Sequence, residues 1–229
     1  MTLYKKNEEC TSYKRCKKYR VCEKCNNIRQ AKLSDITELA TRFSPRATYT
    51  VIMPKAEAQV ESVIKAVKSK ITRKVKQSVD GTFISVETSK NDALHLNILT
   101  MGQSIITPEP FKEVIKKMGI AADLYHEEVA TSDIRNITAY ALKMQSLPTK
   151  DQYSGNLYNI TGSVRNAKNI MQSQRMFRYA PAVAVLSMCN TLIKWGIKPP
   201  TEKMLKFNSM RAITESLCDL VNQIDTQEI

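Results

Sequence analysis

Hydrophobic and polar positions alternate most regularly near the middle of the chain. Ile84 and Val86 alternate with polar residues, and after a short polar turn Leu94, Leu96 and Ile98 do the same. A period of two is that of a strand with one buried face. Two such runs joined by a short turn predict an antiparallel β-hairpin.

The hydrophobic pattern also predicts the elements around this hairpin. Spacings of three and four indicate amphipathic helices, and two runs rich in β-branched and aromatic residues indicate strands. We expect strands at 48–53 and 120–129 and helices at 34–42, 55–77, 108–118 and 133–147. Ser34 is the expected N-cap of the first helix. This order of elements predicts an α+β fold with an antiparallel sheet covered by helices, close to a split βαβ layout.

Changes in composition divide the chain into three parts. Ser44, Pro45 and Arg46 interrupt the pattern and mark a border after residue 44. We expect a basic, cysteine-rich arm with a linker helix at 1–44, the main domain at 45–170 and a helical C-terminal extension at 171–229.

The hairpin decides which of its side chains share a face. If the turn is centred on Asn91, Glu87 and His95 lie opposite each other across the two strands, and Asn97 projects from the same face. A carboxylate, an imidazole and an amide oxygen together suit a hard cation such as Mg²⁺ or Mn²⁺. The alternative is a solvated sheet face with an incidental histidine.

Charge favours a polyanionic partner. The formal net charge is +13, and the first 32 residues hold ten Lys or Arg against three acidic residues. Nucleic acid is the first candidate, because neutralising phosphates releases counterions; a basic tail without specific function is the alternative. The longest apolar run is too short to span a bilayer, so we expect a cytoplasmic protein with no membrane partner.

Four cysteines lie close together in the basic arm, at Cys10, Cys16, Cys22 and Cys25. In a cytosolic protein such a cluster favours metal over disulfides, and the tight spacing of the last pair is that of a zinc knuckle. We therefore expect a structural Zn²⁺ site. A redox pair or a site with three cysteines is the alternative.

A tyrosine stands at the border of the last predicted helix of the main domain. Ile134, Ile137, Ala141 and Met144 form one apolar stripe, and Tyr140 lies at its edge. Its ring is expected to be supported and its hydroxyl to be free. The alternative is a boundary tyrosine that only anchors the helix.

Together these segments resemble a known family. GTFISVETSKNDALHLNIL, followed about forty residues later by NITAYALK, is similar to the replication-initiator and transposase branch of the HUH endonucleases, which nick single-stranded DNA through a tyrosine. NITGSVRN at 159–166 resembles a glycine, serine and arginine run of rolling-circle initiators. The resemblance covers roughly residues 10–168, and the order of its motifs is that of this branch.

The resemblance implies roles for particular residues. His95 and Asn97 occupy the two ligand positions of the family's metal strand, with Asn97 where the motif has a second histidine, and Glu87 is the acid that completes the shell. Tyr140 is the implied nucleophile, and Lys143 matches a lysine one turn later that would assist the tyrosine or contact phosphate. The candidate DNA contacts are Lys14, Arg15, Lys17, Lys18, Arg20, Arg73, Lys74 and Arg165.

Two classes of function follow. The first is a metal-dependent endonuclease and strand transferase that forms a 5′-phosphotyrosine at single-stranded or hairpin origin DNA, in rolling-circle replication of a plasmid or phage in a bacterial or archaeal host, or in transposition. A host helicase and polymerase would be its partners, since the chain carries no GxxxxGK[ST] motif. The second is a zinc-dependent nucleic-acid-binding or regulatory protein that keeps the fold without cleavage.

Overall fold

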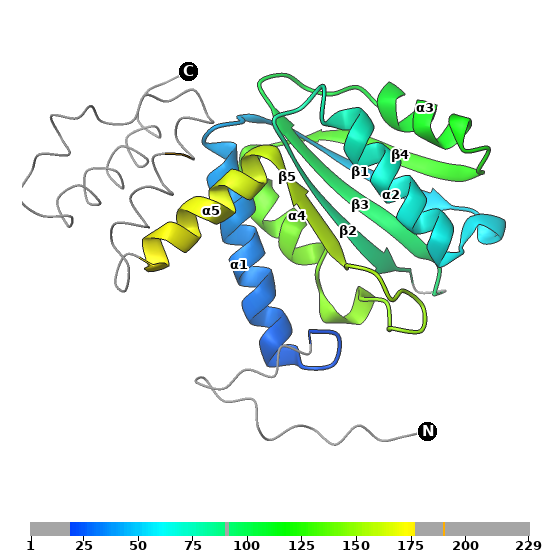
Figure 1. Ribbon diagram of the computed structural model, residues 1–229, viewed down its shortest axis with the longest axis horizontal. Coiled ribbons are helices and arrows are strands. Elements are labelled where there is room, and N and C mark those ends of the chain that lie inside the picture. Colours follow the sequence, from blue (N-terminus) through cyan, green and yellow to red (C-terminus); the bar gives the residue numbers. More distant parts are fainter. Residues whose placement is uncertain (1–18, 90–91, 177–189, 191–229) are drawn as a thin grey trace, which may run out of the picture.

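The computed structural model describes residues 19–89, 92–176 and 190, and the helices and strands within them form one sheet with helices on both sides (Figure 1). The five strands are β1 (Arg46–Pro54), β2 (Gly81–Thr88), β3 (Leu94–Gly102), β4 (Ala122–Val129) and β5 (Tyr158–Thr161). The α-helices are α1 (Glu23–Thr41), α2 (Glu61–Val75), α3 (Glu109–Lys117), α4 (Ile134–Tyr140) and α5 (Gly162–Met176). Single 3₁₀ turns occur at Ala56–Ala58, Thr131–Asp133 and Met144–Ser146. Within these ranges no helix is both long and apolar enough to cross a bilayer.

The strand order is β4-β1-β3-β2-β5, and every neighbouring pair is antiparallel. Because β1 and β2 both run against β3, they are parallel to each other with β3 between them, and α2 connects them. The same relation holds for β3 and β4, which are connected by α3 with β1 between them. The predicted α+β fold with a split βαβ layout is therefore observed, and β3 lies at the centre of the sheet.

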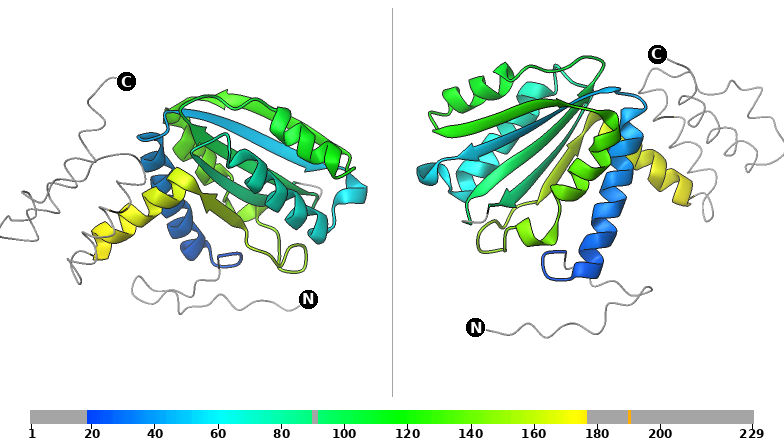
Figure 2. Two further views of the ribbon diagram at one scale, coloured as in Figure 1. Left: turned by 45° about the horizontal axis from the view of Figure 1, so that its top comes forward. Right: turned by 180° about the vertical axis from the view of Figure 1, so that it is seen from behind.

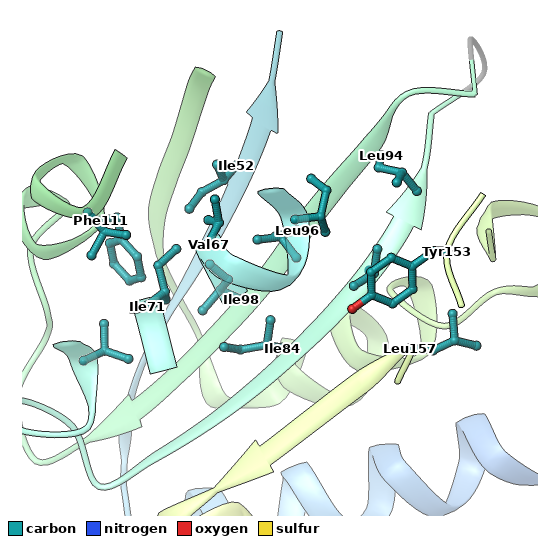
Figure 3. Packing of buried hydrophobic residues seen from close by; sticks show 14 of the residues in the cluster. Ile52, Val67, Ile71, Ile84, Leu94, Leu96, Ile98, Phe111, Tyr153 and Leu157 are labelled. Carbon is teal, nitrogen blue, oxygen red and sulfur yellow. The ribbon is translucent and has the colours of Figure 1, made fainter. Parts of the chain in front are cut away.

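One face of the sheet packs under α2 and α3. Ile84, Ile98 and Ile52 point from three adjacent strands towards Ile71 of α2 and Phe111 of α3, and all five are at most 1% exposed (Figure 3). The alternation that predicted the hairpin explains this core, because every second side chain of a strand points to the same face.

The opposite face is covered by α1, α4 and α5 over only part of its area (Figure 2). There Phe83 of β2 and Leu99 of β3 pack with Ile36 of α1 and Leu142, which follows α4. Towards the hairpin turn, the same face presents polar residues instead.

The first helix is longer than predicted. It begins at Glu23, and Ser34 is not its N-cap but a residue 2% exposed in the middle of the helix. The prediction was wrong because a serine is only a local signal for a helix start, whereas Leu33, Ile36 and Ala40 pack against the sheet and stabilise a helix on both sides of it. The helix therefore shares its hydrophobic core with the sheet.

The helix that carries Tyr140 is shorter than predicted. It spans seven residues and ends at Tyr140 itself, and a turn and a 3₁₀ segment replace the predicted helix up to residue 147. Lys143 therefore lies in the turn after the helix. This shorter form is stabilised by contacts of the turn with the sheet and with α1, where Asn26 Nδ2 donates to the carbonyl oxygen of Leu142 at 3.0 Å.

The NITGSVRN segment forms the junction of β5 and α5. Gly162 has a φ of +54°, and a Cβ at this position would lie 1.7 Å from the carbonyl oxygen of Asp80. That carbonyl also accepts a hydrogen bond from the Ser163 amide at 2.8 Å. The glycine is thus required by a close approach of two backbone segments.

Candidate active site

Glu87 and His95 meet as predicted on the partly open face of the sheet. They are register partners in β2 and β3, and His95 Nε2 lies 3.1 Å from Glu87 Oε2. The carboxylate is nearly inaccessible, with its side chain 3% exposed, while the imidazole is 16% exposed. The other carboxylate oxygen of Glu87, Oε1, accepts a hydrogen bond from Ser146 Oγ at 3.0 Å. Buried carboxylates require such partners, and here both oxygens have one.

Asn97 lies beside this pair on the same face. Its register partner is Ser85, and its Oδ1 accepts a hydrogen bond from the Tyr49 hydroxyl at 2.5 Å. Within the part of the chain that the structure describes, Asn97 Nδ2 and Ser85 Oγ are buried polar atoms without a hydrogen-bond partner. Two unpaired polar atoms on directly opposite residues identify this patch as a place where a water or an ion completes the hydrogen bonding.

Tyr140 and Lys143 contact each other in the segment that leads to Ser146. Tyr140 is 57% exposed, and Lys143 Nζ lies 3.6 Å from the centroid of its ring, a cation–π contact. The turn that carries Lys143 is tied to the sheet, since Ser146 Oγ is 3.1 Å from the Lys143 carbonyl oxygen and also reaches Glu87. Glu87, His95 and Asn97 thus share one sheet face, and the segment that follows Tyr140 is tied to Glu87 through Ser146.

Tyr49 connects the two halves of this site, although the sequence did not single it out. Burial raises the pKa of its hydroxyl, as does the negative charge of the nearby Glu87. Tyr140, Glu127 and Tyr125 raise the same pKa through weaker electrostatic effects, so all of these groups lie near one another. The Tyr49 hydroxyl therefore stays protonated and donates to Asn97 at neutral pH. Its place in β1, a strand that borders β3, was the only signal in the sequence.

The geometry of Glu87 and His95 is compatible with a divalent ion. Two cis ligands of an octahedral ion at about 2.1 Å are about 3.0 Å apart, close to the observed 3.1 Å between His95 Nε2 and Glu87 Oε2. The unpaired amide of Asn97 adds a third group, and exchanging the two ends of that amide would present its oxygen. Among the described residues, however, no group of three or more His, Cys, Asp or Glu side chains could hold a metal ion. A divalent ion held here would need Asn97 as its third protein ligand.

The predicted DNA contacts within the described residues have different environments. Arg20 donates to the carbonyl oxygens of Tyr153 at 2.6 Å and Gly155 at 3.1 Å, so it holds a loop. Lys74 pairs with Glu113 at 2.9 Å, and Arg165 donates to the carbonyl oxygen of Ile160 at 3.1 Å.

Arg73 differs from these three, because it lines a pocket beside α2. The other predicted contacts, Lys14, Arg15, Lys17 and Lys18, lie outside the described residues.

The predicted zinc site is described only in part. Cys22 precedes the first residue of α1, and Cys25 is 1% exposed in its first turn. Thiolates at a helix N-terminus are favoured by the helix dipole. Cys10 and Cys16 lie outside the described residues, so the four-cysteine site stays a prediction.

No model of a known protein family, no curated protein and no solved structure matches this chain.

Proposed function

We propose that this protein is a metal-dependent, single-tyrosine endonuclease and strand transferase for single-stranded DNA, of the HUH type, that starts rolling-circle replication of a plasmid or phage. The observation that carries this proposal is the link between the Glu87–His95 pair and the segment after Tyr140. Ser146, in that segment, hydrogen bonds to Glu87, which supports a position of the tyrosine near the candidate metal ligands. A transposase would use the same chemistry.

Each residue has a chemical role in this proposal. Glu87, His95 and Asn97 would hold Mg²⁺ or Mn²⁺, and such an ion would supply Lewis-acid stabilisation of the negative charge on the scissile phosphate. The Tyr140 oxygen attacks the phosphorus, which forms the new O–P bond, while the bond to the 3′ oxygen breaks. The phenolic proton passes to a water, and the departing 3′ oxygen takes up a proton. Lys143, close to the Tyr140 ring, contacts a phosphate oxygen.

The product is a 5′-phosphotyrosine and a free 3′-hydroxyl. Attack of that hydroxyl on the phosphotyrosine reverses the reaction and reseals the strand without a nucleotide cofactor. A polymerase extends the 3′ end, and a host helicase supplies unwinding. The exposed position of Tyr140 supports this role, because the hydroxyl of a tyrosine 57% exposed is accessible to a strand of DNA.

A gel assay tests the proposal. We expect a covalent protein–DNA adduct when the protein is incubated with single-stranded origin-region DNA and Mn²⁺, analysed by denaturing electrophoresis and mapped by peptide sequencing to Tyr140. Tyr140→Phe should abolish the adduct and retain DNA binding. Tyr19→Phe is the matched control, because Tyr19 is a tyrosine 37% exposed ahead of α1, and it should leave the adduct unchanged. An adduct that survives in Tyr140→Phe would sink the assignment.

A nucleic-acid-binding protein that does not cleave is the second candidate. It is favoured by the hydrogen bond from Tyr49 that engages the Asn97 oxygen, and by the lack of a third His or acidic ligand among the described residues. In that case DNA binds, no adduct forms with either ion, and the divalent ion has no effect on a labelled oligonucleotide.

We further propose that the arm binds one structural Zn²⁺ through Cys10, Cys16, Cys22 and Cys25. About one zinc per chain should copurify, and Cys22→Ser should reduce it when the metal content is measured by elemental analysis. Well-folded protein free of zinc would contradict this assignment.

A further inference from the structure

A second polar region lies on the other side of the sheet, next to the edge strand β5. It is a pocket of about 520 Å³ between α2, the loop at 153–156 and β5. Its wall carries three cations, Lys65, Lys68 and Arg73, and no acidic residue. Small-ligand pockets are mostly lined by apolar side chains, whereas this one has no aliphatic side chain in its wall.

Lys68 is the most unusual of the three cations. It is 8% exposed, and its Nζ donates to the carbonyl oxygen of Asn156 at 2.7 Å. No carboxylate among the described residues forms an ion pair with it. Burial lowers its pKa to about 8. A buried ammonium group is costly unless an anion compensates it.

The other two cations in the wall differ in whether an acidic group pairs with them. Lys65 is already compensated, because its Nζ lies 2.9 Å from Glu61 Oε1 and 5.9 Å from the centroid of the Tyr153 ring. Arg73, five residues beyond Lys68 in α2 and also in the pocket wall, is exposed, and within the described ranges no ion pair includes it. Two uncompensated cations of α2 therefore line one pocket.

The loop that forms the far wall is held in place independently of any ligand. Glu61 Oε1 accepts hydrogen bonds from the Ser154 amide at 2.6 Å, the Ser154 hydroxyl at 2.8 Å and the Gly155 amide at 3.0 Å. Arg20 binds the same loop from its carbonyl side. The pocket is thus preformed, which lowers the entropy cost of filling it.

We propose that this pocket binds the sugar–phosphate backbone of a nucleic acid strand, with Lys68 and Arg73 as its phosphate contacts. The inference deepens the proposed function, because it adds a second DNA site on the opposite side of the sheet from Tyr140. A cationic wall suits a phosphodiester chain, and the excess charge of +13 on the whole chain favours the same partner. Asn159 in the wall adds an amide for a sugar or base edge.

Counted in strands across the sheet, the pocket also lies close to the candidate active site. Tyr158 lines the pocket and is the register partner of Ser85, which in turn is the register partner of Asn97. Two strand spacings of about 4.8 Å each therefore separate the β5 edge from the metal strand. One DNA strand would pass around the β5 edge of the sheet to reach both sites.

Binding of a fluorescent single-stranded oligonucleotide, followed by anisotropy over a range of salt concentrations, tests the proposal. We expect Lys68→Met and Arg73→Met each to weaken binding about three- to tenfold and to lower the salt slope by about 0.7. Lys70→Met is the matched control, because Lys70 is an exposed lysine of α2 outside the pocket, and it should change neither quantity. Equal losses in all three variants, or no loss in Lys68→Met and Arg73→Met, would overturn the proposal.

A second measurement locates the DNA and separates this site from Tyr140. Photo-crosslinking of a bromouracil oligonucleotide, with peptide mapping, should label segment 153–159 or the adjoining part of α2 in the full chain. Crosslinks elsewhere only would contradict the proposal, as would a mononucleotide that binds as tightly as the oligonucleotide. Failure of the Tyr140 adduct with these crosslinks intact would reject the nuclease and keep the pocket. An adduct without crosslinks would do the reverse.

Discussion

The two faces of the sheet are formed by the same strands but have different uses. Under α2 and α3 the face is apolar at its centre, with Ile84, Leu96 and Ile98 all inaccessible to solvent, and its polar groups are paired, as Thr50 is with His126. The opposite face is apolar only where α1, α4 and α5 cover it, and it ends in Glu87, His95 and Asn97. One face therefore stabilises the fold, which leaves the other free to carry polar groups that stabilise it little.

The polar end of the second face is buried as well, so its polar groups are shielded from water in the same way as the apolar groups of the first face. Glu87 and Asn97 are each 2% exposed, yet Asn97 Nδ2 and the neighbouring Ser85 Oγ have no hydrogen-bond partner within the described ranges. Unpaired buried polar groups cost stability. A fold tolerates such a cluster where it serves binding or chemistry, and the opposite face supplies the stability that offsets it.

The largest effect is expected on the apolar face. Ile98→Ala should lower the free energy of unfolding by about 2–5 kcal/mol, because it leaves a cavity in the core. The Ile98 side chain is 0% exposed. Urea denaturation measures the change. Val60→Ala, at a valine 55% exposed, is the control and should cost less than about 0.5 kcal/mol. A small effect at Ile98 would remove the distinction between the two faces.

The polar face should respond less in stability and more in metal binding. Glu87→Ala should cost about 1–3 kcal/mol, because His95 and Ser146 lose their partner. Glu87→Gln keeps the shape and can retain both hydrogen bonds, so its stability should stay close to that of the wild type.

Thermal melts with and without Mn²⁺ separate the two roles of Glu87. Mn²⁺ should raise the Tm of the wild-type protein and of neither variant, because both lack the carboxylate ligand. An equal rise in all three proteins would place the ion elsewhere.

Lys68 tests whether a buried charge on the α2 side of the sheet lowers the free energy of unfolding. Its folded pKa of about 8 is below the ordinary 10.5, so the cost of burying its charge is complete below pH 8 and disappears as the pH rises to 10.5. Lys68→Met should therefore increase stability by about 1–2 kcal/mol at neutral pH. The gain should fall as the pH approaches 10.5, when urea denaturation is repeated at each pH; a gain that does not change with pH would show that burial of charge is not its cause.

The smallest effect is expected at Tyr49. Tyr49→Phe removes the hydrogen bond to Asn97 and should cost about 0.5–1.5 kcal/mol. Tyr125→Phe, on the exposed β4, should be closer to neutral in the same urea titration. A cost at Tyr125 equal to that at Tyr49 would mean that the Tyr49 hydroxyl has no special place in the site.

The faces and the register of the hairpin were predicted from the local pattern of hydrophobic and polar residues. Alternation placed Ile84 and Ile98 on one face, and the centre of the turn placed Glu87 opposite His95, both as observed. These predictions succeeded because a hairpin is a local structure: its register follows from the turn, and a slip of one residue would move every side chain to the wrong face.

Residues that depend on distant contacts were not found from the sequence. Ser146 bonds to Glu87 across 59 positions, and Tyr49 bonds to Asn97 across 48. Neither residue stands out in its own segment. The early end of the helix at Tyr140 and the early start of α1 have the same origin, since packing against other elements decided both.

The sequence by itself determined strands β1 to β4, the faces of the hairpin and the excess of positive charge, because these depend on side-chain periodicity and composition. The tertiary structure alone decided the edge strand β5, which hydroxyl bonds to Glu87, how Asn97 is held and where the cations of α2 line a pocket. Such arrangements depend on which surfaces pack together, and the free energy of that packing comes from residues far apart in the chain.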